Sequence, residues 1–165
     1  VKDMLSNFSV KVDDSDKSPG WKFSESEMRG IPVRVELGPK DMEANQAVLV
    51  RRDTREKIFA SLDELEIAIP ALLNELAQNL YARALENREN RTWAATTMDE
   101  VKALAEANNG YIKTMWCGDV ACEEKMKEEV GLSSRCMPFE QEHLSDVCPE
   151  CGKPAKVMVY WGKAY

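Results

Sequence analysis

Four of the five cysteines fall into two closely spaced pairs, and paired thiolates are common ligands of tetrahedral zinc. Cys117 and Cys122 form the first pair. Cys148 and Cys151 form the second, and Gly152 follows it as in a zinc knuckle. The spacing predicts a structural zinc site, with buried free thiols as the alternative. A catalytic zinc is not expected, because four thiolates leave no open position for water.

Few other residues have the type and spacing that catalysis requires. Cys136 stands alone in a strand-like run, and we expect it in the core. His143 is the only histidine and lies in a polar segment, so a Ser-His-Asp or Cys-His site is hard to build. Gly30 and Gly38 are isolated and do not form a phosphate-binding loop. The pattern favours a binding module with a zinc-stabilised appendage.

Aromatic and basic residues near the start of the chain suggest a second site. Trp21, Phe23, Arg34 and Lys40 could stack on and donate to nucleic-acid bases. The alternative, which we favour for the two aromatics, is that they lie in the core while the charges are solvated. Residues 17–57 hold nine Lys and Arg against seven Asp and Glu, a balance of +2 in a chain of net charge −7. An anionic partner could therefore dock on this stretch, although the overall charge disfavours non-specific nucleic-acid binding.

The composition is that of a folded globular chain. Hydrophobic residues make up 44% and charged residues 31% of the 165 residues, which argues against disorder. No run approaches the roughly 18 apolar residues of a membrane span, and no signal peptide is recognisable. Five cysteines without a secretion signal make disulfides an unfavoured interpretation. Because the chain opens at Val1, we expect a piece of a longer polypeptide.

The apolar periodicity predicts an α/β first half. Helices are expected at residues 1–8, 24–29 and 61–87, and strands at 9–12, 31–37 and 46–52. Pro19-Gly20 is typical of a turn. A capping box of Ser61 and Glu64 opens the long helix, in which Pro70 predicts a break or kink. The resulting sheet is thin, so a further strand is expected before residue 1.

The polar stretch 86–91 predicts a boundary between domains 1–90 and 91–165. In the second domain, Thr97 and Glu100 form a capping box that opens a helix ending before Gly110. Another helix is expected at 119–129, and strands are expected at 111–115, 135–139 and 156–161. The second domain is therefore predicted to be a small α+β unit that holds the zinc.

Longer stretches of the sequence carry a family resemblance. Residues 20–41 (GWKFSESEMRGIPVRVELGPKD) and the RRDT element at 51–54 closely resemble the signature of the anticodon-binding domain of prolyl-tRNA synthetases. WCGD at 116–119, RCMPF at 135–139 and the ending YWGKAY are similar to the C-terminal zinc domain of the archaeal and eukaryote-like branch. These motifs are long and ungapped, and the resemblance covers nearly the whole chain.

The resemblance implies an α/β module, shared by several class II synthetases, that reads anticodon bases of tRNA(Pro). The side chains it places at the anticodon are Glu27, Arg34, Lys40, Asp41 and Lys57. The proline anticodon carries two guanines, which suits these residues. Arg and Lys can donate to guanine O6 and N7, and a carboxylate can accept from N1 and N2.

For the second domain, the resemblance implies a structural zinc and a role for the last residue. The zinc ligands carried over are Cys117, Cys122, Cys148 and Cys151. Cys136 matches a position that is not usually a ligand, and the terminal carboxylate of Tyr165 would point towards the active site of the full-length enzyme. The first strand and most of the first helix of the anticodon-binding domain are absent, and Ser26 stands where the family often has Trp.

The class II catalytic motifs are absent as well, so this segment alone should be inactive. The implied parent is a cytoplasmic, homodimeric proline–tRNA ligase that binds ATP, Mg²⁺ and L-proline outside this segment and charges tRNA(Pro). A free-standing tRNA-binding accessory module and a zinc-stabilised structural domain without a catalytic core are the alternatives.

Overall fold

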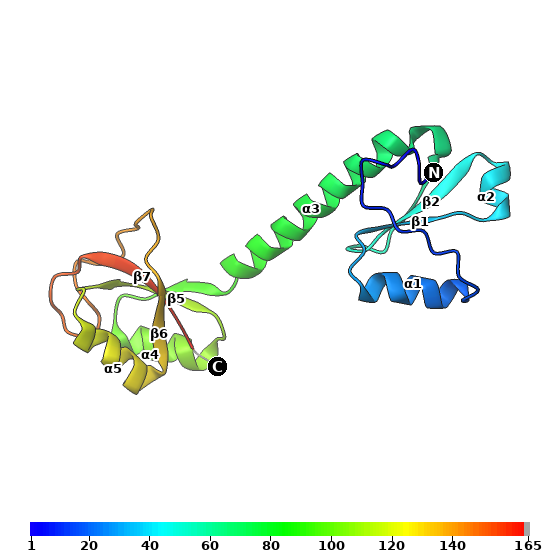
Figure 1. Cartoon of the computed structure of the whole chain (residues 1–165). Coiled ribbons are helices and arrows are strands. Elements are labelled where there is room, and N and C mark those ends of the chain that lie inside the picture. Colours follow the sequence, from blue (N-terminus) through cyan, green and yellow to red (C-terminus); the bar gives the residue numbers. More distant parts are fainter. Residues whose placement is uncertain (164–165) are drawn as a thin grey trace. The chain divides into compact units, whose positions relative to one another are not determined.

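The computed structural model describes residues 1–163 and divides into two units, residues Val1–Arg83 and Ala84–Tyr165 (Figure 1). Helix α3 (Leu65–Glu89) begins in the first unit and ends in the second, within the polar stretch 86–91 expected as a boundary. No helix among residues 1–163 is both long and apolar enough to cross a bilayer.

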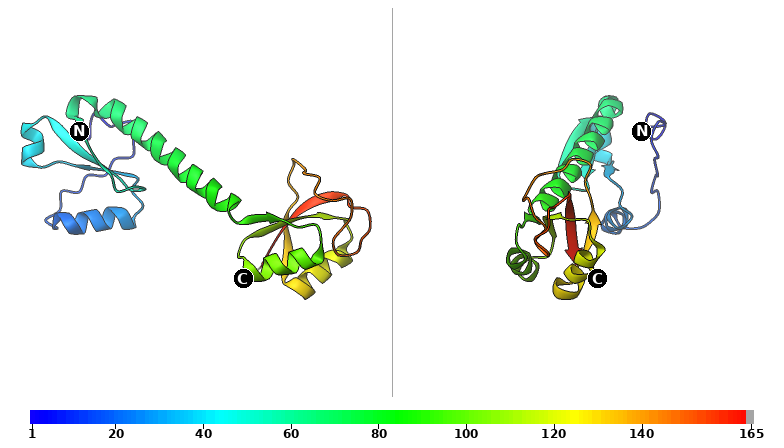
Figure 2. Two further views of the ribbon diagram at one scale, coloured as in Figure 1. Left: turned by 180° about the vertical axis from the view of Figure 1, so that it is seen from behind. Right: turned by 90° about the vertical axis from the view of Figure 1, so that its left-hand side faces the viewer.

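The first unit is built on a three-stranded antiparallel sheet of order β1-β2-β3. Its strands are β1 (Val33–Glu36), β2 (Gln46–Arg51) and β3 (Lys57–Ser61). Its helices are α1 (Pro19–Met28), α2 (Pro39–Glu43), the single 3₁₀ turn η1 (Leu62–Glu64) and the start of α3. The two views of Figure 2 show α1 and α3 on opposite sides of this sheet.

Strand alternation decides which face of the sheet forms the core. Ala47 and Leu49 of β2 are buried on the face that packs against Leu65, Ile69 and Leu72 of α3. Since successive side chains of a strand point to opposite faces, the residues between them line the other face. We call this second face, which carries the side chains of Arg34, Glu36, Val48, Val50, Lys57 and Phe59, the outer sheet face.

Helix α1 starts earlier than the sequence predicted. Ser18 is the N-cap, and its hydroxyl accepts a hydrogen bond from the Trp21 amide at 3.4 Å. Pro19 occupies the first helical position, where a missing N–H costs nothing and the fixed φ suits the helix. The prediction of a turn at Pro19-Gly20 was therefore wrong, because proline at a capped N-terminus starts a helix.

The chain before α1 also differs from the prediction. Residues 1–8 form turns and not an α-helix, although Leu5 is buried in the core. A single turn of i to i−4 bonding, from the Leu5 amide to the Val1 carbonyl at 3.1 Å, is too short to nucleate a stable helix. Residues 9–12 are not a strand and have no ladder partner within the described part of the chain.

Three further local differences have simple causes. Strand β3 was missed because its five residues follow a polar turn in which Arg55 has a φ of 62°. The Ser61 hydroxyl caps the Asp63 amide at 3.3 Å and not the Glu64 amide, because the chain enters α3 through a 3₁₀ turn. Helix α3 continues through Pro70 without the predicted break, since burial of its apolar side secures it on both sides of the proline.

The second unit is a four-stranded sheet of order β4-β5-β7-β6 with two helices. Only the β4–β5 pair is parallel, whereas β7 pairs antiparallel with β5 and β6. In chain order the elements are β4 (Thr92–Ala94), α4 (Met98–Ala107), β5 (Tyr111–Trp116), α5 (Val120–Val130), β6 (Leu132–Cys136) and β7 (Val157–Lys163). Strand β4 was not predicted, and β6 lies earlier than the expected 135–139.

The predicted helix ends of the second unit are confirmed. Thr97 caps the Glu100 amide at 3.3 Å, and the Glu100 carboxylate returns to the Thr97 amide at 3.2 Å. Helix α5 ends at Gly131 in the left-handed region, with a φ of 73°. The core centres on Trp161, which is 1% exposed and donates from Nε1 to the Thr114 hydroxyl at 2.9 Å. The one polar atom of this large side chain is thereby satisfied.

A buried charge pair joins the β2–β3 turn to α3 in the first unit. The Arg51 guanidinium donates to both oxygens of Asp53, at 3.1 and 2.8 Å, and to Glu75 at 3.1 Å. Asn79 also donates to Asp53. The Asp53 side chain is only 1% exposed, and hydrogen bonding by Arg51 holds its pKa well below the ordinary value despite burial.

Replacing Asp53 with Asn should therefore destabilise the first unit by about 1.5–3 kcal/mol at pH 7, since hydrogen bonds to a charged group are lost. The folded pKa lies below the ordinary value of 3.8, so the stabilisation is complete above pH 3.8, declines below it, and is lost as the pH falls through the folded pKa. Urea unfolding should accordingly show a smaller difference between parent and variant at pH 3 than at pH 7.

Glu75→Gln is the matched control, because Glu75 contacts the same arginine but is 60% exposed. Its loss should stay below about 1 kcal/mol. An Asp53→Asn penalty that is the same at both pH values would contradict the assignment.

Candidate functional site

The outer sheet face holds an arginine whose side chain is fixed from several directions. The Arg34 guanidinium carbon lies 4.2 Å from the ring centroid of Phe23, which α1 supplies. Its Nη2 contacts Glu36 Oε1 at 2.8 Å, and its Nη1 contacts Glu27 Oε1 at 3.7 Å. Its Nη1 also donates to the Ser26 hydroxyl at 3.2 Å. Stacking and hydrogen bonds thus orient the guanidinium before any ligand arrives.

Lys57 joins the same group from β3. Its Nζ lies 3.5 Å from Glu36 Oε2 and 6.0 Å from the Phe23 ring centroid. Glu36 therefore lies between the two cations and contacts both. Sequence reasoning missed Glu36, although its position two residues after Arg34 on a predicted strand places both side chains on one face. Arg34, Lys57, Glu27 and Glu36, with the Phe23 ring below, form what we call the Arg34 cluster.

The other two predicted anticodon residues lie on the short helix α2. Asp41 Oδ2 accepts the Gly38 amide at 3.0 Å, which caps the helix. Asp41 Oδ1 accepts from the Gln46 side chain at 3.4 Å. Lys40 is exposed and makes no ion pair among residues 1–163. The structure thus brings Glu27, Arg34 and Lys57 together in one group, whereas Asp41 contacts the sheet through Gln46 and Lys40 stands exposed on α2.

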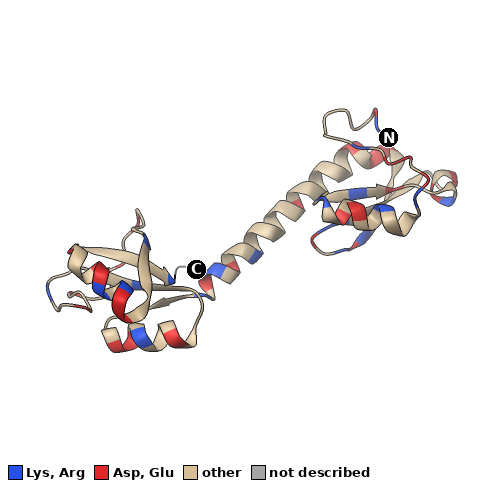
Figure 3. Cartoon of the chain, turned by 60° about the horizontal axis from the view of Figure 1, so that its bottom comes forward, with Lys and Arg blue, Asp and Glu red and all other residues tan. Residues whose placement is uncertain are grey.

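The two aromatics that we expected in the core behave differently. Trp21 is 48% exposed and lies under the Lys17 ammonium, 5.7 Å from its ring centroid, so its core assignment was wrong. Phe23 is half-buried and supports Arg34 and Lys57. Figure 3 shows basic and acidic residues interspersed on the elements of the first unit. A nucleic acid would therefore meet individual cations and not one large basic patch.

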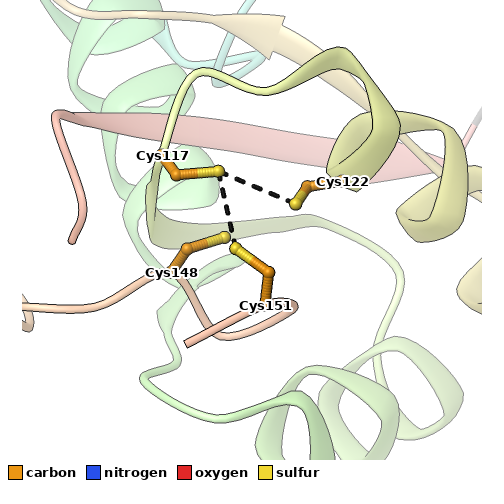
Figure 4. Close-up of side chains that lie close together, drawn as sticks. All are labelled: Cys117, Cys122, Cys148 and Cys151. Carbon is orange, nitrogen blue, oxygen red and sulfur yellow. Dashed lines mark hydrogen bonds between the residues drawn. The ribbon is translucent and has the colours of Figure 1, made fainter. Parts of the chain in front are cut away.

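The second unit brings four cysteine side chains together, as Figure 4 shows. Cys117 lies directly after β5, Cys122 lies on α5, and Cys148 and Cys151 lie in the loop before β7. The Sγ atoms of Cys122 and Cys151 are each 3.7 Å from that of Cys117, and all four Sγ atoms lie within 4.8 Å of one another. Four thiols this close could bind a metal ion.

The four thiols differ in their surroundings, and glycines shape the backbone beside each pair. Gly118 and Gly152 follow a cysteine of each pair with φ of 84° and 68°, a conformation that glycine adopts freely. The Lys153 amide lowers the pKa of Cys151, whereas burial raises the pKa of Cys122 and of Cys148. Three of the thiols are buried and Cys151 is at the surface.

The remaining candidates lie outside both groups. Cys136 is exposed near the end of β6 and not in the core, because β6 is an edge strand and its outer residues are uncovered. His143 is 72% exposed and close to Asp146, which confirms its surface position. Tyr165 lies outside the described residues.

Two family models match the parts of the chain that hold these two groups. Residues 1–72 match a family model described as anticodon binding domain. Residues 98–165 match one described as prolyl-tRNA synthetase, C-terminal. The chain thus carries an anticodon-binding domain over residues 1–72 and a domain of the prolyl-tRNA synthetase C-terminal family over residues 98–165.

Similar proline–tRNA ligases occur in several bacteria. The one from Clostridium novyi is 64% identical over 156 residues, covering 94% of this chain and 33% of that protein. Proline–tRNA ligase 2 of Bacillus thuringiensis subsp. konkukian is 63% identical over the same shares of both chains. The chain thus spans about a third of the length of the curated relatives it matches.

A solved structure of a prolyl-tRNA synthetase has the same fold over nearly the whole chain. A prolyl-tRNA synthetase from Cryptosporidium parvum, crystallised with L-proline and AMP, matches with a TM-score of 0.90 at 32% identity. The match covers 99% of this chain and 36% of that one. Both units therefore have the folds found in a proline–tRNA ligase.

Proposed function

We propose that this chain is the tRNA-recognition end of a proline–tRNA ligase, and that the Arg34 cluster reads an anticodon base of tRNA(Pro). The observation that carries the proposal is the convergence of Glu27, Arg34 and Lys57 on the outer sheet face. These residues lie within the stretch that matches the anticodon-binding model. Proteins hold unstacked bases by stacking them on aromatic rings or guanidinium planes and by hydrogen bonds to their edges, and the Arg34 cluster contains groups of both kinds.

The cluster offers both donors and acceptors to a guanine edge. Arg34 can donate to O6 and N7, and a carboxylate can accept from N1 and N2. Glu27 is the better acceptor, since it is 42% exposed and only 3.7 Å from Arg34, whereas Glu36 is 17% exposed and held at 2.8 Å. Glu36 therefore positions Arg34 and Lys57 while Glu27 turns to the base.

Lys40 and Asp41 form the second part of the proposed reader. Asp41 lies next to Gln46, further along the outer sheet face than Arg34. Lys40 is exposed beside it and free to contact a base or a phosphate. We place this reader in a first domain of residues 1–90, followed by a C-terminal domain of residues 91–165.

For the C-terminal domain we propose structural Zn²⁺ held by Cys117, Cys122, Cys148 and Cys151. With Zn–S bonds of about 2.3 Å, tetrahedral geometry puts neighbouring sulfur atoms about 3.8 Å apart. The two Sγ separations of 3.7 Å fit that value. Bound zinc would stabilise four thiolates and tie the loop before β7 to β5 and α5. It would leave no ligand position for substrate.

The remaining expectations concern the parent enzyme. We propose that it is cytoplasmic and homodimeric, and that ATP, Mg²⁺ and L-proline bind outside this segment. Tyr165 would approach that active site. The near-complete structural match to the Cryptosporidium parvum enzyme supports membership of the archaeal and eukaryote-like branch, although the sequence relatives named above are bacterial.

Arg34→Ala should weaken binding of tRNA(Pro) by about 1–3 kcal/mol and reduce discrimination against changed anticodon guanines. The measurement is a titration of the 165-residue chain at fixed low salt with tRNA(Pro) and with the same tRNA carrying replaced guanines. Arg29→Ala is the control, because Arg29 is the exposed C-cap residue of α1 and, within residues 1–163, forms an ion pair with Glu25 alone. Equal binding by the parent and Arg34→Ala would refute the assignment.

Cys148→Ser should abolish stoichiometric zinc and unfold the second unit while leaving the first unit folded, because metal binding and folding are coupled at such sites. Zinc content by elemental analysis and circular dichroism of parent and variant would test this. Cys136→Ser, at an exposed thiol outside the four, should retain full zinc. One zinc per chain in Cys148→Ser would show that the ligand set is wrong.

A further inference from the structure

Phe59 lies on the outer sheet face, halfway along the edge strand β3, and is 65% exposed. The strand register places the side chains of this face in rows. Arg34, Val50 and Lys57 form the first row, and Glu36, Val48 and Phe59 form the second. Gln46, paired with Ser61, begins the third row. Residues two apart on a strand are separated by roughly 6.8 Å, so Phe59 is the immediate neighbour of Lys57.

The second row lies between the two parts of the proposed reader. The first row carries Arg34 and Lys57, while Gln46 of the third row holds Asp41. RNA that engages both must pass over the second row, where Val48 is buried and Phe59 stands exposed. The core residues beside Phe59 on β3 are Ile58 and Ala60, which point to α3, so packing of the core does not require an aromatic here.

We propose that Phe59 is a stacking platform for an unpaired nucleobase of the anticodon loop, next to the base held by the Arg34 cluster. This inference rests on the proposed function. An exposed aromatic ring next to a lysine suits single-stranded RNA, because a base can stack on its face while the neighbouring Lys57 ammonium attracts the RNA backbone. Phe59 therefore adds affinity without selecting one base, whereas the Arg34 cluster supplies the selection.

The test titrates the 165-residue chain with an RNA hairpin of the tRNA(Pro) anticodon arm at fixed low salt. Phe59→Ala and Phe59→Leu should each weaken binding roughly 5- to 150-fold, the range found when a stacking aromatic is removed. Phe59→Tyr keeps the ring and should bind within about twofold of the parent. Ile67→Ala is the matched control, because Ile67 is also an exposed apolar residue, at 76%. It belongs to α3, which packs on the opposite face of the sheet from Phe59.

A second set of hairpins, each with one loop base removed, shows whether the ring contacts a base. For the one hairpin that lacks the stacked base, Phe59→Ala and the parent should bind with equal affinity. For every other hairpin, Phe59→Ala should show its full loss of affinity. Thermal unfolding of every variant should match that of the parent, since the side chain is mostly exposed.

Each contrary outcome has a distinct meaning. If Phe59→Ala binds like the parent while Arg34→Ala is impaired, the stacking inference fails and the proposed function stands. If Phe59→Leu binds like the parent, the ring is not needed and the inference is wrong. It is also wrong if the affinity loss of Phe59→Ala persists with every hairpin, because Phe59 then does not stack on a loop base. If the parent shows no selective RNA binding, both proposals fail.

Discussion

The two-residue alternation of three short strands governs the first unit. It sends Ala47 and Leu49 into the core beneath α3 and sends Arg34, Glu36, Lys57 and Phe59 to the outer face. A register shift of one residue would bury the charged set and expose the core. The buried Arg51–Asp53 pair, at the turn between β2 and β3, ties that turn to α3 through Glu75 and Asn79.

The second unit must hold in place a long connection between β6 and β7 that contains no helix or strand. Cys148 and Cys151 on that connection come together with Cys117 and Cys122, which stand next to and on regular elements. The Gln141 side chain accepts the Met158 amide at 2.6 Å and fixes another part of the same connection. A metal at the four thiols would complete this attachment.

Strong local signals were read correctly from the sequence, and features that depend on distant contacts were not. The capping box of Thr97 and Glu100 and the end of α5 at Gly131 follow from neighbouring residues, as do the strands at Val33–Glu36 and Gln46–Arg51. Cys136 was misplaced because its exposure depends on which strand is at the sheet edge. Glu36 was missed because its role appears only when Arg34 and Lys57 are seen on either side.

Glu36 also sets the charge balance of the proposed reader. The two cations and two carboxylates of the Arg34 cluster balance in charge, with the exposed Arg55 3.9 Å from Glu27 at its rim, so the cluster presents donors and acceptors with little net charge. A neutral group displaces few counterions when it meets a base, whereas contacts of lysine with phosphate displace one each. Discrimination between anticodons should then change little with ionic strength, even where total affinity falls steeply.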